Sequence, residues 1–176
     1  QPGQKVLING AGGGVGTFAV QIARYFGAEV TGVDSTEKLD MVSSIGADHV
    51  IDYTQEDFTR NGQHYDLILD VVAYRMILDY KRSLSSKGIC LFIGGSMPAV
   101  FLGALLAPLI LMKSSKKIGI LAWKPNKKED LVFLKELLVS GKIIPVIDKR
   151  YPLSETAEAL RYLEEGHAQG KLVITM

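Results

Sequence analysis

The chain has 176 residues, the length of one ordinary domain. Apolar residues make up 47% and charged residues 22%, so there is enough apolar surface for a core and a disordered chain is excluded. The net charge is +1, which gives no field that would attract nucleic acid. The one cysteine, Cys90, can form neither an internal disulfide nor a cysteine-based zinc site, which fits a reducing compartment such as the cytoplasm.

The first half of the chain alternates short apolar runs with segments of helical periodicity. Residues 5–9 form an apolar run that ends in glycines, which predicts a buried strand. Apolar residues then recur at spacings of three and four from Val15 to Phe26, which predicts a helix that Gly27 ends. The other elements predicted in this half are strands at 29–33, 49–52 and 65–72, a helix from Ser35 to Gly46, and a small helix at 55–59.

The second half continues the same alternation. Helices are predicted at 77–84, 126–139 and 154–165, and strands at 89–93, 118–122 and 171–175. In the helix 126–139, the residues expected to face inward are Leu131, Leu134, Leu137 and Leu138. The apolar run 99–112 is too short to cross a bilayer as a helix, which takes about 20 residues, so no membrane segment is expected.

This order of elements predicts the fold class. Parallel strands need a crossover, which is usually a helix, and the predicted strands are continuous apolar runs, as expected when both sheet faces are covered. The sequence therefore predicts an α/β fold with a doubly wound parallel sheet, as a single domain over residues 1–176.

A glycine-rich loop follows the first predicted strand and opens the first predicted helix. Residues 11–16 read A-G-G-G-V-G, close to the dinucleotide-binding pattern G-x-G-x-x-G. Gly13 would let the backbone approach a pyrophosphate, and Gly16 would let the helix pack against the strand. Asp34 ends the second strand, where a carboxylate accepts hydrogen bonds from the adenosine ribose or caps the next helix.

The chain resembles the cofactor-binding half of a medium-chain dehydrogenase/reductase on the zinc-independent quinone-oxidoreductase branch. The resemblance covers the whole chain, and its carriers are Val6–Ala11 with Gly14-Val15-Gly16, Gly46–Tyr53, Asp70-Val71-Val72, Leu84–Gly88 before Gly94-Gly95, Tyr151-Pro152-Leu153 and Gly170–Ile174. It implies that residues 1–176 form a dinucleotide-binding domain with a Rossmann fold, without the N-terminal GroES-like domain that lines the cleft for the small-molecule substrate. Because the chain has no initiator Met and reaches a predicted strand by Lys5, we expect an excised piece of a longer protein. The resemblance also implies an oxidoreductase that transfers hydride between a nicotinamide cofactor and a carbonyl, enone or quinone.

The expected cofactor site combines the residue patterns with this resemblance. The glycine loop would hold the pyrophosphate, and the loops at the carboxyl ends of two strands would hold the nicotinamide. Lys38 and Tyr53 match positions that hold the 2′-phosphate in NADP-using relatives, whereas the charge of Asp34 opposes that phosphate, so NAD(H) is favoured over NADP(H). The expected cofactor-binding residues are Gly13, Gly14, Val15, Gly16, Asp34, Lys38, Tyr53, Val72, Ala73, Gly94 and Gly95. No catalytic residue is assigned.

Three further expectations concern metals, partners and alternative functions. The three histidines lack metal-ligand spacing, so no metal site is expected. The apolar strand 118–122 is expected at a sheet edge, where it would join a second copy into a homodimer. Two other functions fit the glycine loop: an S-adenosylmethionine-dependent methyltransferase and a non-catalytic nucleotide-binding module.

Overall fold

The centre of the molecule is a six-stranded parallel sheet. The computed structural model describes residues 1–95, 105–112, 114–121 and 127–176. The sheet has the strand order β3-β2-β1-β4-β5-β6, and every neighbouring pair is parallel. Its strands are β1 (Lys5–Asn9), β2 (Glu29–Asp34), β3 (His49–Asp52), β4 (Tyr65–Asp70), β5 (Leu84–Phe92) and β6 (Lys117–Ile120). This is the predicted doubly wound α/β fold, in which the strand order reverses between β1 and β4.

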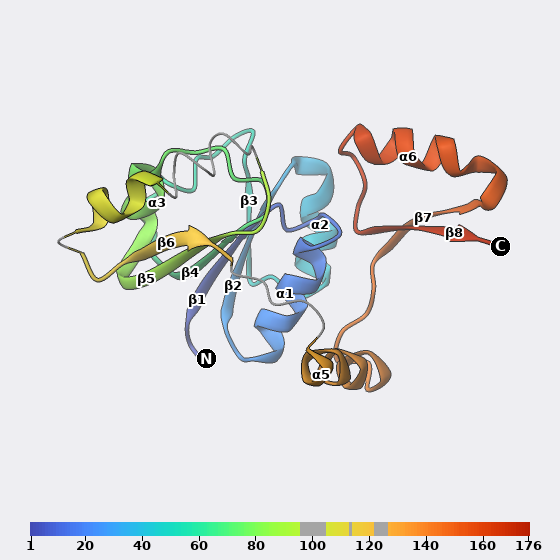
Figure 1. Ribbon diagram of the computed structural model, residues 1–176, viewed down its shortest axis with the longest axis horizontal. Helices are drawn as coiled ribbons and strands as arrows, with labels where there is room; N and C mark the ends of the chain where they lie inside the picture. Colours follow the sequence, from blue (N-terminus) through green and yellow to red (C-terminus); the bar gives the residue numbers. More distant parts are fainter. Residues whose placement is uncertain (96–104, 113, 122–126) are drawn as a thin grey trace.

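Helices cover both faces of the sheet. Alternate residues of each strand point to opposite faces, so each strand contributes apolar side chains to both. Ile8 of β1 packs with the apolar residues of α1 (Gly16–Tyr25) and α2 (Thr36–Ser44). Its neighbour Leu7 packs on the other face, with Tyr80 of α3 (Ile77–Ser83) and with the helical residues 105–111. Figure 1 shows α1 and α2 on one side of the sheet and α3 on the other. Each face therefore has its own apolar core.

The C-terminal part forms a second, smaller sheet. The predicted strand 171–175 is present as β8 (Lys171–Thr175), but it pairs in parallel with β7 (Ile147–Pro152) rather than with the central sheet. Between these strands lie the 3-10 turn Leu153–Glu155 and helix α6 (Thr156–Glu164). β7 was not predicted, because Lys149 and Arg150 interrupt its apolar pattern. Figure 1 shows this unit on the side of α1 and α2, opposite α3.

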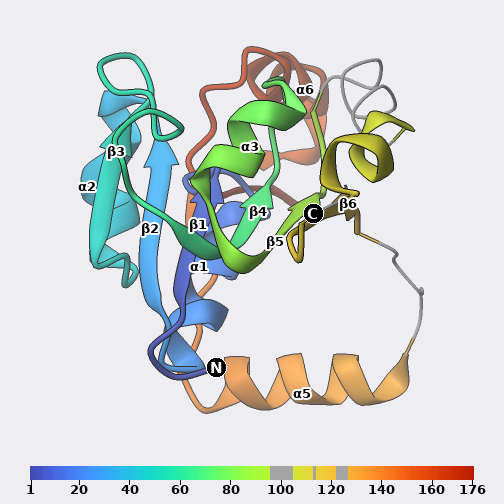
Figure 2. The same cartoon turned by 90° about the vertical axis from the view of Figure 1, so that its left-hand side faces the viewer.

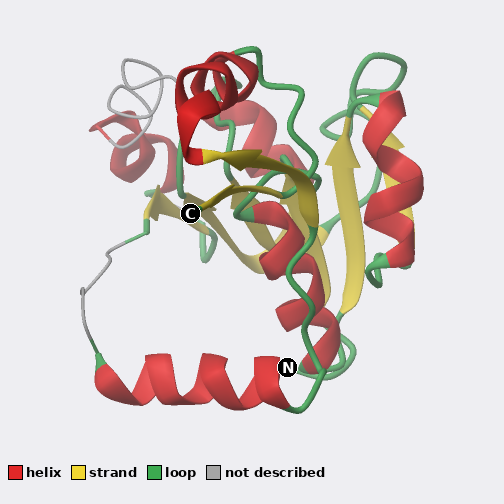
Figure 3. Ribbon diagram, turned by 90° about the vertical axis from the view of Figure 1, so that its right-hand side faces the viewer, coloured by secondary structure: helices red, strands yellow, loops and turns green. Residues whose placement is uncertain are grey.

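Helix α5 (Lys128–Val139) lies at the periphery. Figures 2 and 3 show it beside the end of α1, separated from β6. Only Leu137 of this helix is buried, whereas Leu131 is 61% and Leu138 40% exposed, so the prediction that these two residues face inward is wrong. The backbone after α5 is held instead by buried Gln21, whose side-chain amide donates to the Ile144 carbonyl and accepts from the Ile144 N–H.

Two other sequence predictions differ from the structure. The predicted helix 55–59 is wrong, since this segment consists of turns in which Asp57 accepts from the backbone N–H and the hydroxyl of Thr59. The predicted strand at 89–93 begins earlier, because β5 already pairs with Tyr65 at Leu84. Among the helices in the described ranges, none combines the length and the hydropathy that a bilayer span requires.

Candidate dinucleotide-binding site

A cavity lies where the strand order reverses. It encloses about 930 Å³ at the carboxyl ends of β1, β2 and β4. Its walls come from the glycine loop, from the start of α2, from the segment after β4, and from the C-terminal segment 163–172. In open α/β sheets, ligands bind at this position, outside the carboxyl ends of the strands.

The glycine loop brings the start of α1 close to β1. A side chain on Gly16 would overlap the Gly10 carbonyl oxygen and the Ala11 backbone, so only glycine allows this packing. Gly13 is open instead, since a Cβ there would meet nothing nearer than the Gly10 oxygen at 3.6 Å. Within the described residues, the N–H groups of Gly14 and Val15 have no hydrogen-bond acceptor. The loop therefore presents free backbone donors at a helix N-terminus, which is the arrangement that binds phosphate oxygens.

The end of β2 carries a buried pair of opposite charges. Asp34 accepts from the Gly12 N–H through Oδ2 at 2.7 Å and from the Ser35 N–H through Oδ1 at 2.9 Å. Lys38, one turn into α2, places its Nζ 3.9 Å from Asp34 Oδ1, and both residues are 8% exposed. Asp34 thus fixes the glycine loop to β2 and still borders the cavity.

The C-terminal segment closes one side of the cavity. Its Gly170 N–H donates to the Gly12 carbonyl at 2.9 Å, and Lys38 Nζ donates to the Gly166 carbonyl at 3.0 Å. The Gln169 side chain adds a longer contact, at 3.4 Å, to the Glu37 carbonyl. Residues more than a hundred positions apart in the sequence are thereby joined around one cavity.

A buried carboxyl group supports the segment after β4. Asp70, at the end of that strand, accepts from Tyr80 Oη at 2.7 Å, from Asn9 Nδ2 at 3.0 Å and from the Val72 N–H at 3.0 Å. Burial raises the pKa of Asp70, and these three donors offset only part of that rise. Asn9 and Val72 both line the cavity, so Asp70 positions its wall. The sequence pattern did not predict this role for Asp70, although Asp70 ends an apolar strand as Asp34 does.

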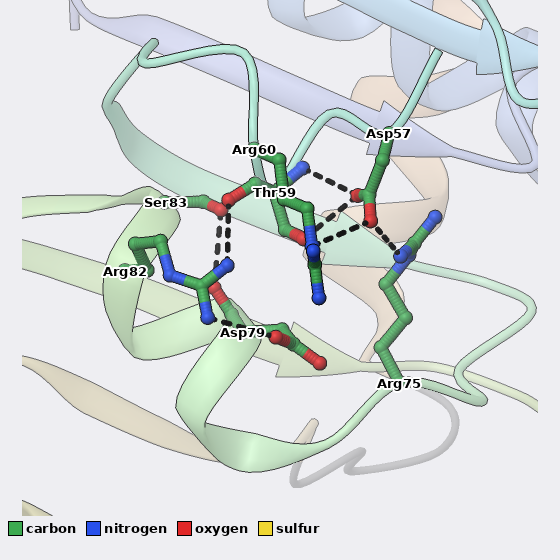
Figure 4. Close-up of polar contacts among 7 residues, drawn as sticks. All are labelled: Asp57, Thr59, Arg60, Arg75, Asp79, Arg82 and Ser83. Atoms are coloured by element: carbon green, nitrogen blue, oxygen red, sulfur yellow. Dashed lines mark hydrogen bonds and ion pairs between the residues drawn. The ribbon is translucent and has the colours of Figure 1, made fainter. Parts of the chain in front are cut away.

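A second polar network, made of residues that do not line the cavity, also holds the segment after β4. Arg75 Nη1 lies 2.8 Å from Asp57 Oδ2, and Arg82 bonds both the Thr59 carbonyl and Asp79, as Figure 4 shows. Burial raises the pKa of Asp57, but the donors of Thr59 and the charge of Arg75 outweigh it, so that the pKa lies below its usual value. The network ties the turns after β3 to the segment that precedes α3.

The structure brings about half of the predicted site residues together at the cavity. Those that line it are Gly13, Gly14, Asp34, Lys38, Tyr53 and Val72. Val15, Gly16, Ala73, Gly94 and Gly95 are not among its lining residues. Val15 is 45% exposed beside the lining residue Gly14, and Ala73 pairs with Gly95 in a bridge that leaves no room for a side chain on Gly95. The segment 163–172 also lines the cavity and was not predicted there, although Gly170 and Lys171 are among the residues that carry the family resemblance.

A dinucleotide and a zinc ion require different residues at a binding site. The open Gly13, the free N–H groups and the size of the cavity fit a dinucleotide. The described parts of the chain contain no group of three or more His, Cys, Asp or Glu residues that could hold a metal ion, so these parts do not fit zinc.

Comparisons with known proteins agree with this geometry. A family model described as zinc-binding dehydrogenase matches residues 45–174. The "Quinone-oxidoreductase QR1, chloroplastic" of Triphysaria versicolor is 34% identical over 177 residues, which cover 98% of this chain and 53% of that protein. The "NADPH-dependent alkenal/one oxidoreductase, chloroplastic" of Arabidopsis thaliana is 31% identical over 176 residues, which cover 98% of this chain and 40% of that protein.

A solved structure extends the similarity to three dimensions. The quinone oxidoreductase from Coxiella burnetii superposes with a TM-score of 0.85 and 26% identity, over 100% of this chain and 54% of that one. The chain therefore spans about half the length of the relatives it matches. The fold, the family model and the sequence relatives agree, and the chain belongs to the zinc-binding dehydrogenase family, as a cofactor-binding domain of the medium-chain dehydrogenase/reductase type.

Proposed function

We propose that the chain binds NAD(H) in the cavity and forms the cofactor-binding half of an oxidoreductase. The observation that carries this proposal is that the glycine loop, with N–H groups that lack an acceptor within the described ranges, and the Asp34 carboxylate line the same cavity of about 930 Å³. The nicotinamide ring, when bound, supplies the hydride chemistry. The relatives described as quinone and alkenal/one oxidoreductases support a carbonyl, enone or quinone as the substrate class.

Each wall of the cavity has a role in this proposal. The N–H groups of Gly14 and Val15 would donate to the pyrophosphate, and Asp34 would accept from the adenosine ribose with the lone pairs that Gly12 and Ser35 leave free. Val72, held by Asp70, would border the nicotinamide end. Ala73, Gly94 and Gly95 would shape this end through the bridge between Ala73 and Gly95.

The preference for NAD(H) over NADP(H) rests on the charges at the end of β2. A 2′-phosphate would lie near Asp34 and Glu37, and Lys38 already donates to the Gly166 carbonyl and pairs with Asp34. Two unit charges about 4 Å apart repel by about 4 kcal/mol at an effective dielectric constant near 20. Fluorescence titration should therefore give a lower Kd for NADH than for NADPH. Tighter NADPH binding that Lys38→Ala selectively weakens would reverse the preference.

Thermal-shift measurements test the binding itself. A ligand at 100 times its Kd adds about 2.7 kcal/mol, which raises the Tm of a domain of this size by about 5–10 °C. We expect NADH to give such a shift and S-adenosylmethionine to give none. Gly13→Asp, which puts a carboxylate into open space beside the loop, should abolish the NADH shift, whereas Gly119→Asp, also in open space, should retain it. A shift with S-adenosylmethionine alone would favour a methyltransferase.

The partners and the location are part of the proposal. We propose that a second domain, beyond the half that this chain represents, holds the small-molecule substrate, and that two copies join through the edge strand β6. Nucleic acid and membrane are not proposed partners, because the net charge is only +1. A cytoplasmic location is proposed from the single, buried cysteine and is testable by cell fractionation.

A further inference from the structure

One cation on the cavity wall has no carboxylate partner in the described parts of the chain. Lys171 lines the cavity and forms none of the ion pairs found there. The other lysine of the cavity, Lys38, is buried and paired with Asp34. Glu37 and Glu165 add negative charge to the same walls. An anionic ligand would therefore depend on Lys171 for its positive counter-charge.

The backbone around Lys171 directs this residue to the glycine loop. Gly170 has a φ of +87°, donates to the Gly12 carbonyl, and leaves no room for a side chain beside Val146. The N–H of Lys171 then donates to the Val146 carbonyl at 2.9 Å and begins β8. These bonds fix the start of the last strand next to the start of α1.

The Lys171 side chain lies across Gly14. A Cβ on Gly14 would lie 3.0 Å from Lys171 Nζ and 3.2 Å from its Cδ. The Lys171 side chain therefore occupies space that only a glycine at position 14 leaves open. The ammonium thus lies beside Gly14, whose N–H, like that of the next residue Val15, has no acceptor in the described residues. The centroid of the Phe18 ring lies 6.0 Å from Lys171 Nζ, at the outer limit of a cation–π contact.

We propose that Lys171 binds the pyrophosphate of the dinucleotide, together with the Gly14 and Val15 N–H groups. This inference rests on the proposed function, because it concerns the same cavity. An ammonium donates charge-assisted hydrogen bonds to phosphate oxygens and neutralises part of their charge. The C-terminal strand therefore supplies a cofactor ligand and not only a wall.

The test compares Lys171→Gln, Lys171→Arg and the control Lys149→Gln. Lys149 lies on the neighbouring strand β7, with its Nζ 3.6 Å above the Tyr162 ring, and does not line the cavity. Fluorescence titration of NADH should give a Kd that is about 10- to 100-fold higher for Lys171→Gln and close to that of the parent chain for the other two variants. The Kd of the parent chain should also rise more steeply with salt than that of Lys171→Gln.

Calorimetry with ADP and adenosine locates the effect. Lys171→Gln should weaken the binding of ADP, which carries the diphosphate, and leave the binding of adenosine unchanged. Equal NADH binding and equal salt dependence in Lys171→Gln and the parent chain would overturn the inference while the proposed function stands. An equal loss in Lys149→Gln, or an equal loss for adenosine, would also overturn it. If the parent chain binds neither NADH nor NADPH, the proposed function fails, and the inference fails with it.

Discussion

At the scale of single residues, polar side chains determine the shape of the site. Asp34 ends β2 and Asp70 ends β4, the two strands on either side of β1. Asp34 accepts a backbone N–H from the loop after β1, and Asp70 accepts one from the loop after β4. Burial raises the pKa of Asp70, which reflects the cost of a charge in the interior. The sequence predicted a role for Asp34 because of its distance from the glycine loop, whereas only the structure shows its bond to Gly12.

One buried hydroxyl predicts a stabilising substitution. Thr17 is fully buried at the start of α1, and its Oγ1 has no hydrogen-bond partner within the described residues. Thr17→Val removes this unpaired group at nearly constant volume, so we expect the free energy of unfolding to rise by about 1 kcal/mol. Urea denaturation measures this change.

The matched control is the same substitution at Thr59. This residue is 3% exposed, and its hydroxyl bonds Asp57 at 2.7 Å. Thr59→Val should lower the free energy of unfolding by about 1–3 kcal/mol, because it leaves Asp57 without one donor. A loss of stability in Thr17→Val would mean that its hydroxyl does have a partner.

At the scale of elements, the loops at the carboxyl ends of the strands are held by contacts from distant segments. The segment after β4 is fixed from inside by Asp70 and from outside by the pair Arg75–Asp57. The loop after β1 is fixed by Asp34 and by Gly170. The site is therefore formed by cross-links between elements rather than by one motif.

The pair Arg75–Asp57 predicts a pH-dependent contribution to stability. The pKa of Asp57 in the folded chain lies below its ordinary value of 3.8, so the charged form stabilises the fold. This contribution is fully present above pH 3.8 and is lost as the pH falls through the folded pKa. Asp57→Asn should cost about 1 kcal/mol at pH 7, and the difference from the parent chain should shrink in acid.

Urea denaturation between pH 7 and pH 3 measures this difference. Asp130→Asn, on the exposed start of α5, is the control and should have little effect at either pH. A difference between Asp57→Asn and the parent chain that grows in acid would show that Asp57 does not stabilise the fold as a carboxylate.

At the scale of the whole molecule, the edge strand β6 and the helix α5 both expose apolar side chains. β6 is the edge strand of the central sheet, and Ile120 on it is 51% exposed. This confirms that the strand predicted at 118–122 lies at a sheet edge, although it begins at Lys117 and residue 122 lies outside the described residues. The peripheral helix α5 exposes further apolar side chains, such as Val139 at 80%.

The edge strand predicts self-association. Unpaired backbone groups on β6 would bond those of a second copy and continue the sheet. Light scattering should therefore give twice the mass of one chain at high concentration, and Gly119→Pro, which breaks the pairing, should return it to the monomer. A monomer throughout would contradict this prediction. A dimer that Gly119→Pro leaves intact would place the interface elsewhere.

The length of the chain predicts binding without efficient catalysis. The chain spans about half of its relatives, and hydride transfer requires donor and acceptor to be held at reacting distance. We expect it to bind NADH but to oxidise it with small quinones or enones well below the usual range of about 1–10³ per second. Steady-state absorbance assays measure this rate, and turnover within that range would mean that the chain holds its substrate by itself.

The sequence by itself determined the alternation of strands and helices, the parallel sheet, and the glycine loop between β1 and α1. These follow from local periodicity and from residues a few positions apart. It did not determine that β8 pairs with β7, that Leu131 of α5 is exposed, or that the segment 163–172 reaches the glycine loop. Such contacts join residues far apart in the chain, and they form because backbone groups and buried side chains need partners that only the packed molecule brings within reach.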